Sequence, residues 1–155
     1  MKKLLMQAWK KLPIPFFARR WFTYVTNKRS LVGVNGVITN AAGEALLFKH
    51  AYRKTPWGMP GGWLGHERPA DGLIREVREE SGLEIAVDRV ADAWYEKNVY
   101  GVHVYCIVLI GRVVGGAFRP SAEVSQCGYF RIGDWPDGMR EDQKAVIARA
   151  LGVGA

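Results

Sequence analysis

The sequence predicts an α+β domain in which helices cover a mixed β-sheet, as in an α/β/α sandwich, with a basic helical arm before it. Three observations support this fold class. Strand-like runs lie on both sides of a helix at residues 69–81, and an amphipathic helix at 141–151 closes the chain. Residues 1–30 stand apart in composition, because they contain no Asp or Glu. We therefore expect an arm at residues 1–30 and one domain at residues 31–155.

The arm carries the positive charge of the protein. Its Lys and Arg residues give residues 1–30 a charge of +8, whereas the complete chain has a net charge of +7, so the remainder is near −1. Apolar residues recur at helical spacing over residues 4–12 and again over 16–24, where Arg19 and Arg20 interrupt a set of aromatic side chains. This pattern predicts amphipathic helices in the arm.

The sequence allows four environments for the arm. In descending order of preference, it folds over its own domain or crosses to the partner in a homodimer, lies on an anionic membrane surface through residues 1–24, or meets a nucleic-acid backbone. Nucleic acid ranks last because the domain itself is nearly neutral. A secretory signal is disfavoured, since Gln7 and a second pair of lysines interrupt the apolar stretch.

The strand pattern begins at residue 31. A turn at residues 40–43 joins the first two runs, which predicts a β-hairpin. Gly115-Gly116 should end the long apolar run before it, and residues 84–98 could form one strand or two. The expected strands cover residues 31–39, 44–50, 84–93, 94–98, 101–114 and 129–132.

The central helix has clear ends. Pro69 suits its first position, where a missing N–H is harmless, and Gly82 suits the left-handed residue that follows the helix. One face should be buried, because its apolar residues recur at i, i+3, i+4 and i+7: Ala70, Leu73, Ile74 and Val77. Three carboxylates group on a neighbouring side: Glu76, Glu79 and Glu80.

These carboxylates repel one another, so a positive partner is expected beside them. The residue types alone allow two partners. Arg75 and Arg78 could form salt bridges on an ordinary helix surface, or a hard divalent cation could take oxygen ligands from the glutamates. Glu76 and Glu80 should lie at the edge of the core.

The order of residues from Gly61 to Leu83 favours the cation. It closely resembles the Nudix box, G-x5-E-x7-R-E-U-x-E-E-x-G-U, in which U is aliphatic. Every fixed position is filled, by Gly61, Glu67, Arg75, Glu76, Val77, Glu79, Glu80, Gly82 and Leu83. The turn after Gly61-Gly62 is one residue shorter than usual in the family, with His66 where glycine is common. Which glycine carbonyl faces a metal therefore stays open.

The resemblance implies a Nudix-type fold over roughly residues 31–151 and a set of site residues. Glu76, Glu79 and Glu80 would bind Mg²⁺, or alternatively Mn²⁺, together with a carbonyl of Gly61 or Gly62. Arg75 would orient a glutamate, and Glu67 would hold the turn against the helix. Glu123, just before the strand that ends the sheet region, would supply another ligand or the general base, or is a plain loop acid.

The sequence gives weaker evidence about substrate recognition. Arg53 could meet a phosphate, or lie in a solvated loop. Aromatic side chains could stack on a base or sugar, although aromatics at strand positions more often belong to the core. The candidates for this contact are Trp57, Trp63, Tyr95 and His103.

The implied function is a Mg²⁺-dependent pyrophosphohydrolase that cleaves the diphosphate bond of a nucleoside diphosphate linked to another moiety, such as an NDP-sugar or ADP-ribose. Three alternatives remain: a house-cleaning nucleoside triphosphate pyrophosphohydrolase, an RNA 5′-end processing enzyme, and a non-hydrolytic nucleotide-binding module. The two cysteines, Cys106 and Cys127, are too few for a disulfide scaffold. Free thiols suit a cytoplasmic location, at the periphery of a membrane if the arm binds lipid.

Overall fold

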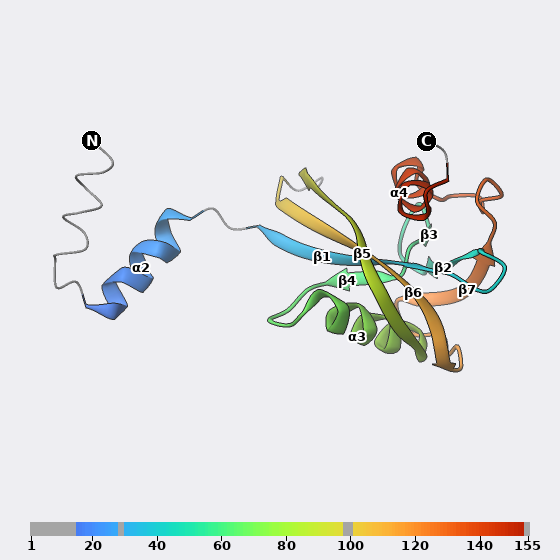
Figure 1. The fold of residues 1–155 in the computed structure, drawn as a ribbon, viewed down its shortest axis with the longest axis horizontal. Coiled ribbons are helices and arrows are strands. Elements are labelled where there is room, and N and C mark those ends of the chain that lie inside the picture. Colours follow the sequence, from blue (N-terminus) through green and yellow to red (C-terminus); the bar gives the residue numbers. More distant parts are fainter. Residues whose placement is uncertain (1–14, 28–29, 98–100, 154–155) are drawn as a thin grey trace.

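The computed structural model describes residues 15–27, 30–97 and 101–153. Two β-sheets form the body of the protein, and Figure 1 shows α3 and α4 on different sides of it. The helices are α2 (Phe16–Thr26), α3 (Pro69–Ser81) and α4 (Glu141–Leu151). The strands are β1 (Leu31–Ile38), β2 (Ala45–His50), β3 (Trp57–Gly58), β4 (Gly61–Trp63), β5 (Leu83–Lys97), β6 (His103–Gly116) and β7 (Val124–Phe130).

The first sheet is mixed, which confirms the expected fold class. Its strand order is β4-β1-β6-β5, with β1 parallel to β6 and antiparallel to β4. The long strands β5 and β6 form an antiparallel ribbon. The second sheet has the order β3-β2-β7 and is antiparallel.

The predicted hairpin between the first two strands is wrong. β1 and β2 belong to different sheets, and only an isolated bridge, Thr39 to Ala45, links the ends of these segments. Both edges of β1 are already occupied, by β4 and β6, so no edge remains for β2. The turn itself exists: the Asn40 side chain accepts hydrogen bonds from the amides of Ala42 and Glu44. It carries the chain from one sheet to the other.

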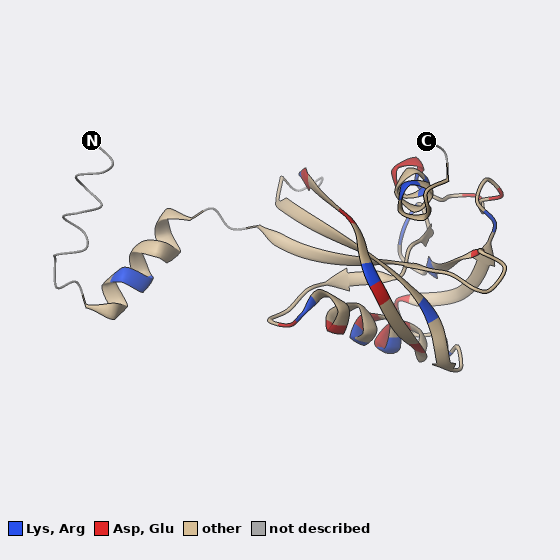
Figure 2. Cartoon of the chain, viewed as in Figure 1, with Lys and Arg blue, Asp and Glu red and all other residues tan. Residues whose placement is uncertain are grey.

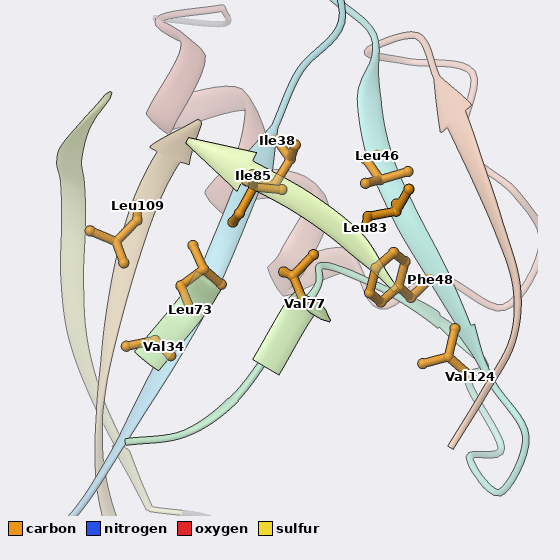
Figure 3. Close-up of a cluster of buried hydrophobic side chains, with 10 residues drawn as sticks. All are labelled: Val34, Ile38, Leu46, Phe48, Leu73, Val77, Leu83, Ile85, Leu109 and Val124. Atoms are coloured by element: carbon orange, nitrogen blue, oxygen red, sulfur yellow. The ribbon is translucent and has the colours of Figure 1, made fainter. Parts of the chain in front are cut away.

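Two hydrophobic clusters lie on opposite sides of β1. On one side, Leu73 and Val77 of α3 pack against Val34 and Ile38 of β1, together with side chains from both sheets (Figure 3). On the other side, Val37 packs with residues of α4, among them Ile147. Because successive strand residues point to opposite faces, β1 is buried on both, which produces the helix–sheet–helix sandwich.

Several boundaries differ from the expectation. Residues 83–97 form one continuous strand that bulges in place of breaking, and β6 runs through Gly116, which pairs with Leu83. The expected glycine turn contains the short strand β4, paired with β1. β7 begins earlier than predicted, at Val124.

The arm is described only in part. The predicted helix at residues 4–12 lies outside the described residues. The second predicted helix is present as α2, and none of its residues is buried. Among the helices in the described ranges, none is long and apolar enough to cross a bilayer.

Candidate active site

The central helix α3 forms as its end residues predict. Pro69 occupies the first turn, and Gly82 adopts the left-handed conformation at φ 71°, with its amide bonded to the Arg78 carbonyl. Arg68 provides no side-chain cap at the start. Leu73 and Val77 are fully buried, which fixes the rotation of the helix and turns its carboxylates toward the edge of the core.

Arg75 is the centre of a charge network on α3. Its guanidinium contacts Glu67 and Glu76 at 2.8 Å each and Glu79 at 3.1 Å. It also donates to the carbonyl of Trp63. The bonds from Arg75 are the main reason why the pKa of Glu67 is lowered. Figure 2 shows basic and acidic residues close together along this helix. Arg75 thus ties the glycine-rich segment to α3 and bonds three glutamates, two of them on α3 itself.

Glu80 has a different environment from Glu79. The side chain of Glu79 is 61% exposed, whereas Glu80 as a residue is 7% exposed and its Oε2 has no hydrogen-bond partner. Burial raises the pKa of Glu80 to about 7, helped by the charges of Glu76 and Glu123. Arg53 and a hydrogen bond from the Gly61 backbone act in the opposite direction. Glu80 therefore lies within electrostatic range of Glu76, Glu123 and Arg53.

Two glycines allow this close approach. A Cβ atom on Gly62 would lie 2.4 Å from the Glu76 carboxylate, and one on Gly61 would lie 2.1 Å from the Val34 carbonyl oxygen. β4 is an edge strand, so alternate backbone groups point away from β1. Gly61 uses its outward amide to bond Glu80. By the same alternation its carbonyl also points away from β1.

The donor set fits a hard divalent cation. Glu76, Glu80 and the outward backbone of Gly61 offer oxygen ligands, and the unpartnered Glu80 oxygen is a buried group that a cation would satisfy. Within the described ranges, no group of three or more His, Cys, Asp or Glu side chains is arranged so that it could hold a metal ion. Glu76 and Glu79 are each bonded to Arg75.

A cleft of about 280 Å³ starts at Gly61 and Gly62, and the carboxylates of α3 are not among the residues that line it. It runs from Arg53, Gly61 and Gly62 past Trp63 to β5, β6 and the start of α4. It lies on the α4 side of the first sheet, since Gly33 and Asn35 of β1 line it with the same alternation as Val37. A depression on the outer face of α3 also contains Arg75 and Glu79, but it lacks the glycines and Arg53.

The structure separates the residues proposed for substrate contact. Arg53 and Trp63 line the cleft. Trp57 packs edge-on against Phe130 with ring centroids 5.1 Å apart and adjoins the second hydrophobic cluster. Tyr95 and His103 stack on each other at 5.7 Å and share a short hydrogen bond, on the strand face opposite to Trp94. The structure therefore does not bring these three residues to the cleft.

The cleft also contains residues that the sequence does not indicate as site residues. Trp94 donates from its indole N–H to Glu96 at 3.3 Å, and both line the cleft. Gln143 accepts a 2.9 Å hydrogen bond from the Met59 amide, which fixes its amide group there. The alternation of Trp94 and Glu96 with Tyr95 could have indicated a shared face. Further cleft residues are Asn35, Val104, Cys106, Arg140 and Asp142.

Comparison with known proteins agrees with the geometry. The family model of the NUDIX domain matches residues 29–150. A MutT-like protein from Streptomyces ambofaciens is 31% identical over 121 residues, which cover 77% of this chain and 73% of that protein.

Solved structures share the fold. An ADP-ribose pyrophosphatase from Streptococcus suis has a TM-score of 0.66 and 24% identity over 80% of this chain and 91% of its own. A UDP-X diphosphatase has a TM-score of 0.70 and 16% identity over 97% of this chain and 78% of its own. The resemblance carried by Gly61 to Leu83 is thereby confirmed, and the chain belongs to the Nudix hydrolase family.

Proposed function

We propose that this protein is a Mg²⁺-dependent pyrophosphohydrolase that cleaves the diphosphate bond of a nucleoside diphosphate linked to another moiety, with Mn²⁺ as an alternative cation. The observation that carries this proposal is the buried Glu80 carboxylate, with one unpartnered oxygen, which feels the charges of Glu76 and Glu123 and accepts a hydrogen bond from Gly61, a residue that also lines the cleft. Similar proteins act on substrates of this kind, as the names ADP-ribose pyrophosphatase and UDP-X diphosphatase state.

The residues would divide the work as follows. Glu76, Glu80 and the carbonyl of Gly61 would hold the cation, which when bound shields phosphoryl charge and acidifies a water molecule. Gly62 is the less suitable carbonyl donor. The Pro60 carbonyl and the Leu64 amide bond β1, so by alternation Gly62 between them also points its backbone groups at β1. Glu79 is exposed and bonded to Arg75, so it would join the set only after releasing that partner.

Arg53 and Glu123 would act on the reacting groups. Arg53 lies in the cleft close enough to Glu80 to affect its pKa, so its cation can bind a phosphoryl oxygen of a diphosphate placed there. Glu123 or Glu80 would accept the proton of the attacking water, because the two carboxylates are close enough for Glu123 to raise the pKa of Glu80. Arg75 would keep Glu76 oriented through its 2.8 Å salt bridge and would not contact substrate.

The remainder of the cleft suits the non-phosphate part of the substrate. Trp63 and Trp94 offer aromatic surfaces, and Glu96 and Gln143 offer fixed polar groups for a base or a sugar. The free thiols of Cys106 and Cys127 are consistent with a reducing compartment, and we place the enzyme in the cytoplasm.

Product identification tests the proposal. The protein is incubated with Mg²⁺ and, in separate reactions, ADP-ribose, UDP-sugars, dinucleoside polyphosphates, nucleoside triphosphates and triphosphorylated RNA, and products are identified by mass. Two monophosphates from ADP-ribose or a UDP-sugar are expected. Release of pyrophosphate from a nucleoside triphosphate would support the house-cleaning alternative. No hydrolysis of any of these compounds would favour a nucleotide-binding module.

A further inference from the structure

The helix α2 has one apolar and one polar face. Phe17, Trp21 and Val25 follow one another at four-residue spacing and so lie on one side of the helix. Arg19 and Thr23 lie on the opposite side, where Thr23 bonds the Arg19 carbonyl, and Arg20 lies at the border of the apolar side, three residues after Phe17. This is the form of a helix that lies at a boundary between an apolar and a polar medium.

The apolar face is open to solvent. Phe17 is 73% exposed, Trp21 66% and Val25 59%, and Phe16 at the start of the helix is 81% exposed. Figure 1 shows α2 set apart from the two sheets. Large contiguous apolar patches are rare on monomeric soluble proteins and mark surfaces that bind something. The face therefore needs an occupant other than the hydrophobic clusters of its own domain.

Charge selects among the occupants. Residues 1–30 carry +8 and contain no acidic residue, and the charged residues of α2 itself are Arg19 and Arg20. Pairing of this helix with its copy would bring two such arms together with no carboxylate in either to offset the repulsion. An anionic lipid surface supplies the missing negative charge, and its interfacial region favours Trp, Phe and Arg.

We propose that α2 is an interfacial anchor that binds this protein to bilayers containing anionic lipids. Its axis would lie in the plane of the membrane, with Phe17, Trp21 and Val25 inserted below the headgroups and Arg19 and Arg20 among the phosphates. The active site would then work next to a membrane surface. This inference is independent of the substrate and of the catalytic proposal.

Vesicle co-sedimentation of the full chain tests this inference. Vesicles of phosphatidylcholine are compared with vesicles that also contain phosphatidylglycerol. We expect binding to the anionic vesicles only, reduced by added salt. Phe17→Ser with Trp21→Ser should weaken this binding by at least roughly tenfold, because two inserted aromatic side chains are lost. Arg19→Gln with Arg20→Gln should weaken it by a smaller factor and reduce its salt dependence.

A matched control removes exposed apolar surface from the body of the protein. Val90 and Val114 are 59% and 58% exposed on β5 and β6, so Val90→Ser with Val114→Ser should leave vesicle binding unchanged. Hydrolytic turnover without vesicles should be unchanged in all three double variants, which shows that each is folded.

Five outcomes would overturn the proposal. Three concern the vesicles: absence of binding to anionic vesicles, equal binding to both kinds of vesicle, and binding that the Phe17 and Trp21 substitutions leave intact. The fourth is a dimer in solution that these substitutions convert to a monomer while vesicles have no effect, since a second copy would then cover the face. Retention of RNA in place of vesicles would likewise assign the basic arm to nucleic acid.

Discussion

Two amphipathic helices of this protein, α3 and α2, meet very different surroundings. α3 has 13 residues and buries Leu73, Val77 and Glu80 among its side chains, whereas α2 has 11 residues and buries none. In α3 each basic residue has acidic neighbours along the helix, whereas the charged residues of α2 are all basic. Periodicity alone predicts both helices equally well. The charges that follow the apolar stripe distinguish a helix that builds a site inside the domain from one that faces outward.

The largest effect should come from the buried carboxylate of α3. Glu80→Gln keeps the shape of the side chain but removes its charge, so kcat should fall by roughly 100-fold to 10,000-fold. Circular dichroism should show an unchanged fold. Glu84, at the start of β5, is an exposed carboxylate, and Glu84→Gln should retain full turnover. Equal turnover of the two variants would remove Glu80 from the chemistry.

The two helices should differ next in how much a substitution in each changes the stability of the protein. Leu73→Ala removes a fully buried side chain from the cluster in Figure 3 and should lower the free energy of unfolding by about 2–5 kcal/mol. Trp21→Ala in α2 removes a larger side chain that is 66% exposed, and should change stability by less than about 0.5 kcal/mol. Urea denaturation measures both. A loss for Trp21→Ala close to that for Leu73→Ala would mean that α2 packs on the domain.

Glu80 of α3 should also make the free energy of unfolding depend on pH. Burial raises the pKa of Glu80 from 4.5 to about 7, so the folded protein holds this proton more tightly than the unfolded chain. Without metal, the stabilisation is complete below the unfolded pKa and is lost as the pH rises through about 7. The loss is on the order of 3 kcal/mol. Denaturation in chelator should show wild type losing stability relative to Glu80→Gln over this pH window, and parallel curves would contradict the assignment.

A smaller effect is expected from the glycine segment. Gly62→Ala places a Cβ atom 2.4 Å from the Glu76 carboxylate and should displace it, with a fall in kcat of roughly tenfold to 100-fold. Gly65→Ala is the matched control, because its Cβ would meet only Glu67 Oε1, at 3.4 Å. Steady-state kinetics should show near-normal turnover for the control. Similar losses in both variants would indicate a general disturbance of the loop.

The smallest effect should appear in recognition. Glu96→Gln removes a charge from the far part of the cleft while leaving a side chain that Trp94 can still bond. KM for the preferred substrate should rise by a few fold with little change in kcat, since this group lies away from the carboxylates. An unchanged KM across different bases and sugars would show that Glu96 does not contact the substrate.

Much of α3 could be predicted from the sequence because its signals are local. Pro69 and Gly82 set its ends, and the spacing of Leu73 and Val77 sets its buried face. The close approach of Glu80, Glu123 and Arg53 depends on three separate segments meeting, and the family resemblance, not periodicity, brought Glu123 into consideration.

The errors have a common cause, since strand pairing is a long-range property. β1 and β2 are adjacent in the chain and joined by a good turn, yet their partners are β4, β6, β3 and β7. The face of the sheet on which each strand residue lies is hard to predict for the same reason. Tyr95 and Trp94 are neighbours, but only Trp94 points into the cleft, and this depends on which side of the sheet α4 covers.

Binding of Mg²⁺ tests most directly whether the carboxylates of α3 form a cation site. Thermal unfolding is followed for wild type, Glu80→Gln and Glu84→Gln, with Mg²⁺ or with chelator. A ligand that binds only the folded state raises its stability, so Mg²⁺ should raise Tm for wild type and Glu84→Gln, and much less for Glu80→Gln. The same increase in all three proteins, or none in wild type, would contradict a cation site at Glu80.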